Sequence, residues 1–146
     1  MTRFRILVAD QAEAVFYDST ALGAAPKEVA RITDPTAHLH ARDLMSDRPG
    51  RSYESFGGAR HALERENDPR QREAVRFARR IARRLDEARR KDEFARLVVV
   101  AGPPFLGLLR HAMSKPTKAC VAHEIHKDLV HGPISVLREH LVASAG

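Results

Sequence analysis

The stretch NDPRQREAVRFARRIARRLDEARRKDEFARLVVVAG, residues 67–102, decides the fold, because a helical pattern runs directly into a strand pattern. Asn67 or Asp68 can cap a helix, and Pro69 suits its first turn. Apolar residues then recur within about 140° of helical arc. These positions are 74, 75, 78, 81, 82, 85 and 88. Residues 95–102 form an apolar, β-branched run, which is typical of a strand covered on both faces. We therefore predict a long amphipathic helix followed by a buried strand.

Short apolar segments separated by turn residues lie on both sides of this stretch. Upstream, residues 4–10 and 14–20 predict a hairpin, and residues 27–33 predict a third strand. The segments expected downstream are a short helix at 103–113, a strand at 118–125 and an amphipathic helix at 133–144. Three antiparallel strands followed by helix-crossed parallel strands predict an α/β fold. We expect a mixed five-stranded sheet with flanking helices, which is the ribonuclease H-like arrangement.

The length of 146 residues and an apolar fraction of 43% suit one domain, which we expect to span residues 1–146. Between residues 37 and 70 the apolar residues are sparse and unperiodic, so we predict a long mobile loop there. Loops of this length inside a domain are usually functional or disordered. The sequence has no run long enough for a membrane span and no secretory signal, which predicts a cytoplasmic protein without membrane contact.

Positive charge is concentrated in the long predicted helix. The chain carries a formal charge of +6, and residues 71–92 hold nine Arg or Lys against four acids. Opposite the apolar arc, six arginines fall within about 100°. We call this set the arginine ridge: Arg72, Arg76, Arg79, Arg80, Arg83 and Arg90. Such a ridge can be a solvated face with internal ion pairs, or it can bind phosphates without reading base sequence.

Other chemistries find less support in the sequence. Asp10 ends the first strand, where two-metal nucleases of the ribonuclease H-like fold place a carboxylate, but the strand at 95–102 ends without an acid. A turn residue accepting backbone hydrogen bonds is the preferred interpretation of Asp10. His123 and His126 lack zincin spacing, and no nucleophile elbow or phosphate-cradling glycine loop occurs. We expect no catalytic residue, no metal site and no cofactor.

Three segments carry a resemblance to a known family. RDLMSDRPGRSYESFGGARHAL, RLVVVAGPPFLGLLR and EIHKDLVHGPISVLREHL resemble the bacterial host attachment family, named from proteins required for attachment to host cells. That family in turn resembles the middle domain of class-1 translation release factors of the eukaryotic and archaeal kind. In those factors a Gly-Gly-Gln loop precedes a long basic helix and enters the peptidyl transferase centre. Gly57 and Gly58 hold the corresponding place here, but Ala59 stands where the catalytic glutamine would be.

The resemblance implies a recognition loop that has lost the hydrolytic group. Glycines permit close backbone approach, and arginines and histidine can contact phosphate. The loop residues assigned to nucleic-acid binding are Arg42, Arg48, Arg51, Gly57, Gly58, Arg60 and His61. Together with Arg72, Arg76, Arg79, Arg80 and Arg83 they complete the candidate site.

Three functions remain open from the sequence. The first is a non-catalytic RNA- or ribosome-associated factor that binds backbone phosphates through the helix and the loop. The second is a protein-interaction or regulatory factor that is indirectly required for attachment to host cells. The third is a metal-dependent nuclease that uses Asp10. The oligomeric state does not follow from the sequence.

Overall fold

The computed structural model describes residues 3–37 and 68–145. Five strands and four helices have both ends within these two ranges, and residues 35–37 are also helical. The strands are β1 (Phe4–Ala9), β2 (Glu13–Ser19), β3 (Lys27–Thr33), β4 (Arg96–Ala101) and β5 (Val121–Ile125). The helices are α3 (Pro69–Arg90), α4 (Pro103–Ala112), α5 (Lys115–Cys120) and α6 (Ile134–Ala145). The mixed α/β class predicted from the sequence is confirmed.

The strands form one sheet in the order β3-β2-β1-β4-β5. β1 and β3 both pair with β2 in antiparallel register, whereas β1–β4 and β4–β5 are parallel. The predicted pattern of three antiparallel strands followed by parallel crossovers is therefore confirmed. β3 is an edge strand, and Val29 has no partner on β2 because a β-bulge interrupts the register there.

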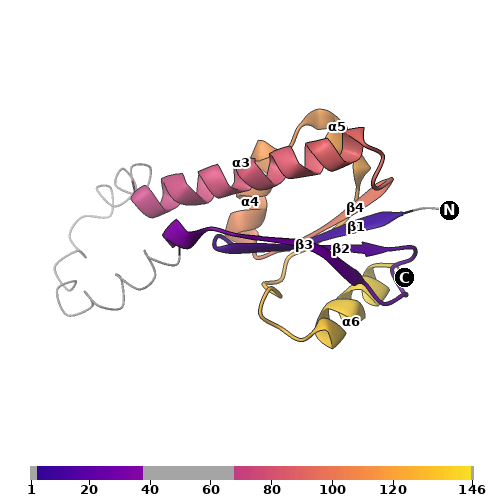
Figure 1. The fold of residues 1–146 in the computed structure, drawn as a ribbon. Helices are drawn as coiled ribbons and strands as arrows, with labels where there is room; N and C mark the ends of the chain where they lie inside the picture. Colours follow the sequence, from indigo (N-terminus) through magenta and orange to yellow (C-terminus); the bar gives the residue numbers. More distant parts are fainter. Residues whose placement is uncertain (1–2, 38–67, 146) are drawn as a thin grey trace.

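Helices cover both faces of the sheet (Figure 1). α3 and α4 lie on one face and α6 on the other. In β4, Leu97, Val99 and Ala101 belong to the core under α3 and α4. Val98 and Val100, which point the opposite way, pack in the core that includes residues of α6. Because strand side chains alternate between faces, this arrangement explains the continuous apolar run.

Capping residues fix both ends of α3. Asp68 is the N-cap, and its carboxylate accepts a hydrogen bond from the Arg70 amide at 2.9 Å. Lys91 is the C-cap, and Asp92 follows in the left-handed region with φ 56°. The helix buries the side predicted from its periodicity, and Phe77 joins that side although the apolar arc omitted it.

The predicted start of the fifth strand is wrong. Lys118–Cys120, expected to open the fifth strand, instead ends helix α5, because the Ser114 hydroxyl caps that helix and Pro116 suits its first turn. The predicted start of the long helix is confirmed, since Asp68 is the N-cap and Pro69 lies in the first turn of α3. The predicted loop, apart from its described ends, lies outside the described residues.

The packing of α3 predicts a strong effect for Ile81→Ala. Ile81 is completely buried in the core between α3 and the sheet. Removing its three outer carbons should lower the free energy of unfolding by about 3 kcal/mol. The control is Arg83→Gln on the exposed side of the same helix, expected to stay within about 0.5 kcal/mol of wild type. Urea denaturation measures both, and equal midpoints for the two variants would contradict the packing.

Candidate functional site

The predicted site residues that the structure describes all lie on α3. Each is exposed, on the side opposite the core. They are Arg72, Arg76, Arg79, Arg80 and Arg83. The predicted loop residues Arg42, Arg48, Arg51, Gly57, Gly58, Arg60 and His61 lie outside the described residues. The described part of the candidate site is therefore the exposed face of α3.

A groove of about 600 Å³ gathers part of the arginine ridge beside α4. Arg76, Arg79 and Arg83 line it from α3, and His111 lines it from the end of α4. Ala82, Asp86 and Ala112 complete the lining. The small alanine side chains leave room between the two helices. Sequence reasoning had no signal for His111, because its position depends on how α4 packs against α3.

The three other ridge arginines do not line this groove. Arg80 reaches the sheet, where its Nη1 donates to the carbonyl oxygen of Thr33 at 3.1 Å. Arg72 lies one helical turn before Arg76 and is exposed. Arg90, at the end of α3, is also exposed and outside the groove. The arginine ridge therefore divides into three arginines that line the groove and three that lie outside it.

The groove arginines differ in their pairing. Arg76 forms an ion pair with Glu73 at 2.9 Å, three residues earlier on the helix. Arg79 and Arg83 make no hydrogen bond or ion pair with any part of the chain that the structure describes. Their guanidinium groups are thus available to an external anion, and each can donate two parallel hydrogen bonds to a phosphate.

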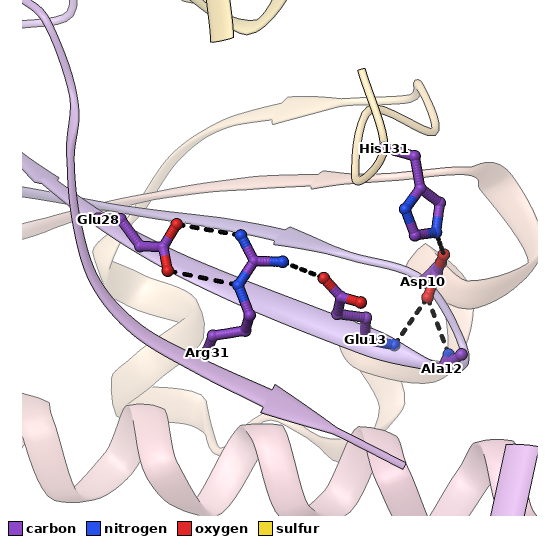
Figure 2. Close-up of polar contacts among 6 residues, drawn as sticks. All are labelled: Asp10, Ala12, Glu13, Glu28, Arg31 and His131. Atoms are coloured by element: carbon purple, nitrogen blue, oxygen red, sulfur yellow. Dashed lines mark hydrogen bonds and ion pairs between the residues drawn. The ribbon is translucent and has the colours of Figure 1, made fainter. Parts of the chain in front are cut away.

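Three arginines outside the groove pair with carboxylates of the described chain. Arg5 contacts Asp18 at 2.5 Å and Glu93 at 3.3 Å. Figure 2 shows Arg31 between Glu28 and Glu13; its Nη2 lies 3.0 Å from Glu28 Oε1. The hydrogen bond from Arg31 lowers the pKa of Glu28 below its ordinary value.

On α4, Arg110 pairs with Glu124 through a hydrogen bond of 3.0 Å from its Nε. That bond lowers the pKa of Glu124. Arg79 and Arg83 differ from Arg5, Arg31 and Arg110 in having no carboxylate partner among the residues that the structure describes.

Asp86 is the acidic residue of the groove lining, and it is anchored to the start of α5. Its Oδ1 accepts a hydrogen bond from Ser114 at 2.7 Å and a second from the Thr117 hydroxyl. Thr117 is fully buried and accepts a hydrogen bond from Arg89 Nε at 3.1 Å. In the sequence, Asp86 is one of the four acids of residues 71–92, and nothing in the helical pattern predicts this anchor.

Opposing effects set the charge state of Asp86. Burial acts to raise its pKa, but the hydrogen bonds from Thr117 and Ser114 outweigh this effect, with help from the charges of Arg89 and Arg90. The net result is a pKa below the usual 3.8. Asp86 is therefore an ionised acceptor at neutral pH.

Asp10 has the role preferred from the sequence. Its Oδ1 accepts hydrogen bonds from the amides of Ala12 and Glu13, both at 2.8 Å (Figure 2). Its Oδ2 lies 3.7 Å from His131 Nε2. β4 ends at Ala101, without an acid. Within the described ranges no three His, Cys, Asp or Glu side chains are placed to hold a metal ion. The turn interpretation is confirmed.

Comparison with protein families gives one match. The model of the family described as "Protein required for attachment to host cells" matches residues 5–141. The chain belongs to this family. The match covers every strand and helix except β1's first residue and the last turn of α6. The comparison with curated proteins found no match. Among the described residues of this host attachment protein, no helix combines the length and apolarity needed to cross a bilayer.

The Asp86 anchor predicts a pH-dependent loss of stability. We expect Asp86→Asn to unfold about 1 kcal/mol more easily at neutral pH, because an amide oxygen accepts weaker hydrogen bonds than a carboxylate. The folded pKa lies below the unfolded one, so this contribution is present above about pH 4 and is lost as the pH falls through the folded value.

Urea midpoints measured over an acid series test this expectation. The urea midpoints of wild type and Asp86→Asn should converge as the pH falls below about 4. Glu87→Gln, an exposed neutralisation on the same helix, is the matched control and should follow wild type at every pH. A wild-type advantage over Asp86→Asn that persists unchanged in acid would refute the role of the carboxylate.

Proposed function

We propose that this host attachment protein binds the phosphate backbone of RNA, free or within the ribosome, through the groove between α3 and α4. The observation that carries the proposal is the pair Arg79 and Arg83, which project into one groove without internal partners. Arg76 and His111 add donors at the same place. Polyanion binding of this kind releases counterions and does not require base readout.

The chemistry of the groove favours binding over catalysis in this proposal. Its lining offers donors and one anchored carboxylate, and it contains no serine, cysteine or lysine. The loop residues from Arg42 to His61 remain a prediction that would extend the same surface. The proposal includes a cytoplasmic location, where cellular RNA is found, and a requirement for host attachment that is met indirectly.

The relation to release-factor middle domains and to the ribonuclease H-like fold is part of the proposal. The sheet supports it with three antiparallel strands followed by two parallel crossovers. The missing glutamine at Ala59 fits a factor that contacts RNA without hydrolysing peptidyl-tRNA.

The binding test uses a double variant with a charge-matched control. Arg79→Gln with Arg83→Gln should weaken binding of single-stranded RNA about tenfold at low salt and reduce the slope of log affinity against log salt by about 2. Lys27→Gln with Lys127→Gln removes the same charge at two exposed positions outside the groove. Fluorescence anisotropy across a salt series measures both. Equal losses in the two double variants would mean that net charge alone drives binding.

A second experiment identifies the cellular partner. We expect tagged protein in a lysate gradient to sediment with RNA-containing particles, and to return to the top of the gradient after RNase treatment. The Arg79 and Arg83 double variant should stay at the top without RNase. Sedimentation that survives RNase would favour the protein-interaction alternative and count against RNA binding.

A further inference from the structure

The groove contains a carboxylate at a place where a purely phosphate-binding surface would have none. Arg76, Arg79, Arg83 and Asp86 follow one another at spacings of three, four and three residues, which puts them on one stripe of α3. Asp86 therefore continues the line of arginines, one helical turn beyond Arg83. A phosphate at this position would be repelled, so the end of the groove must face a different part of the ligand.

Neighbouring side chains hold this carboxylate in one orientation. The guanidinium of Arg89 donates to Thr117, and the Thr117 hydroxyl donates in turn to Asp86 Oδ1. Ser114 supplies a second donor to the same oxygen. Asp86 Oδ2 has no hydrogen-bond partner among the residues that the structure describes. One oxygen is thus fixed by the protein, while the other is left to accept from outside.

An external group that meets Oδ2 has to be a hydrogen-bond donor. In a nucleic-acid strand whose phosphates lie on Arg79 and Arg83, the sugar next to the Arg83 phosphate, on the side away from Arg79, lies toward Asp86. The 2′-hydroxyl of ribose is a donor that RNA carries at every sugar and DNA lacks. We propose that Asp86 Oδ2 accepts a hydrogen bond from a ribose 2′-hydroxyl, so that the groove selects RNA over DNA. This inference rests on the proposed function and adds the sugar specificity.

A base donor is the competing ligand group, since carboxylates also accept from exocyclic amines. The two cases differ in what they discriminate. Recognition of the sugar gives the same preference for ribose with every base, whereas recognition of a base gives a preference that changes with the base and persists in DNA.

The test compares single strands of equal length and identical base sequence. The probes are oligouridine and oligoadenosine, each as ribose, deoxyribose and 2′-O-methyl forms, measured by fluorescence anisotropy. Wild type should bind ribose strands about five- to tenfold more tightly than the other two forms, for both bases. In Asp86→Asn this ratio should fall to near one, mainly because DNA binds better once the repelling charge is gone.

Glu87→Gln is the matched control, because it removes the same charge one residue away without lining the groove. Glu87→Gln should increase the affinity for ribose and deoxyribose strands equally and leave the ratio of the two affinities unchanged. Thr117→Val keeps the charge of Asp86 but removes one of the hydrogen bonds that orient its carboxylate. This variant should reduce the ratio of ribose-strand to deoxyribose-strand affinity.

The possible failures are distinct. Equal wild-type affinity for ribose and deoxyribose strands, or a preference that follows the base, overturns the sugar contact and leaves phosphate binding intact. An Asp86→Asn variant that keeps the full ratio overturns the assignment to Asp86. Absence of binding to every strand at low salt overturns the proposed function itself.

Discussion

The burial of one side of α3 is the constraint on which the rest of the structure depends. Alanines at 74, 78, 82 and 88 let the helix approach its neighbours closely, and Phe77, Ile81 and Leu85 fill the space above the sheet. Because a helix that buries one side must expose the other, the position of every ridge arginine follows from this packing. The same contact fixes α4 beside α3 and so creates the groove.

Charge pairing then distinguishes the groove arginines from several arginines on the rest of the surface. Carboxylates of the same molecule pair with Arg5, Arg31 and Arg110. These ion pairs weaken the attraction of the three arginines for an external anion. At Arg79 and Arg83 the chain supplies no such carboxylate in its described part. The distribution of positive charge is thus more informative than its total, because a neighbouring carboxylate offsets part of the field of a paired guanidinium group.

Much of this architecture follows from local patterns, whereas the site depends on contacts between distant residues. Alternation and helical periodicity predicted β1 to β4 and α3, because each element is stabilised by its own apolar spacing. α5 was missed because a six-residue helix held by Ser114 has no apolar period to detect. The arginines of the groove were predicted, but Asp86 and His111 were not, since 28 residues separate Asp86 from Ser114 and packing alone brings His111 beside α3.

β3 forms an edge of the sheet, where its outer backbone groups have no neighbouring strand within residues 3–37 and 68–145. An open edge is a template on which another molecule can add a strand, and such addition is the first step of aggregation. Pro26 offers no amide proton just before this strand, Lys27 puts a charge at its start, and the bulge at Val29 breaks the regular spacing of its outer groups. Growth of ordered aggregates along this side is therefore opposed by the backbone itself, even at the high local concentrations of a crowded cell.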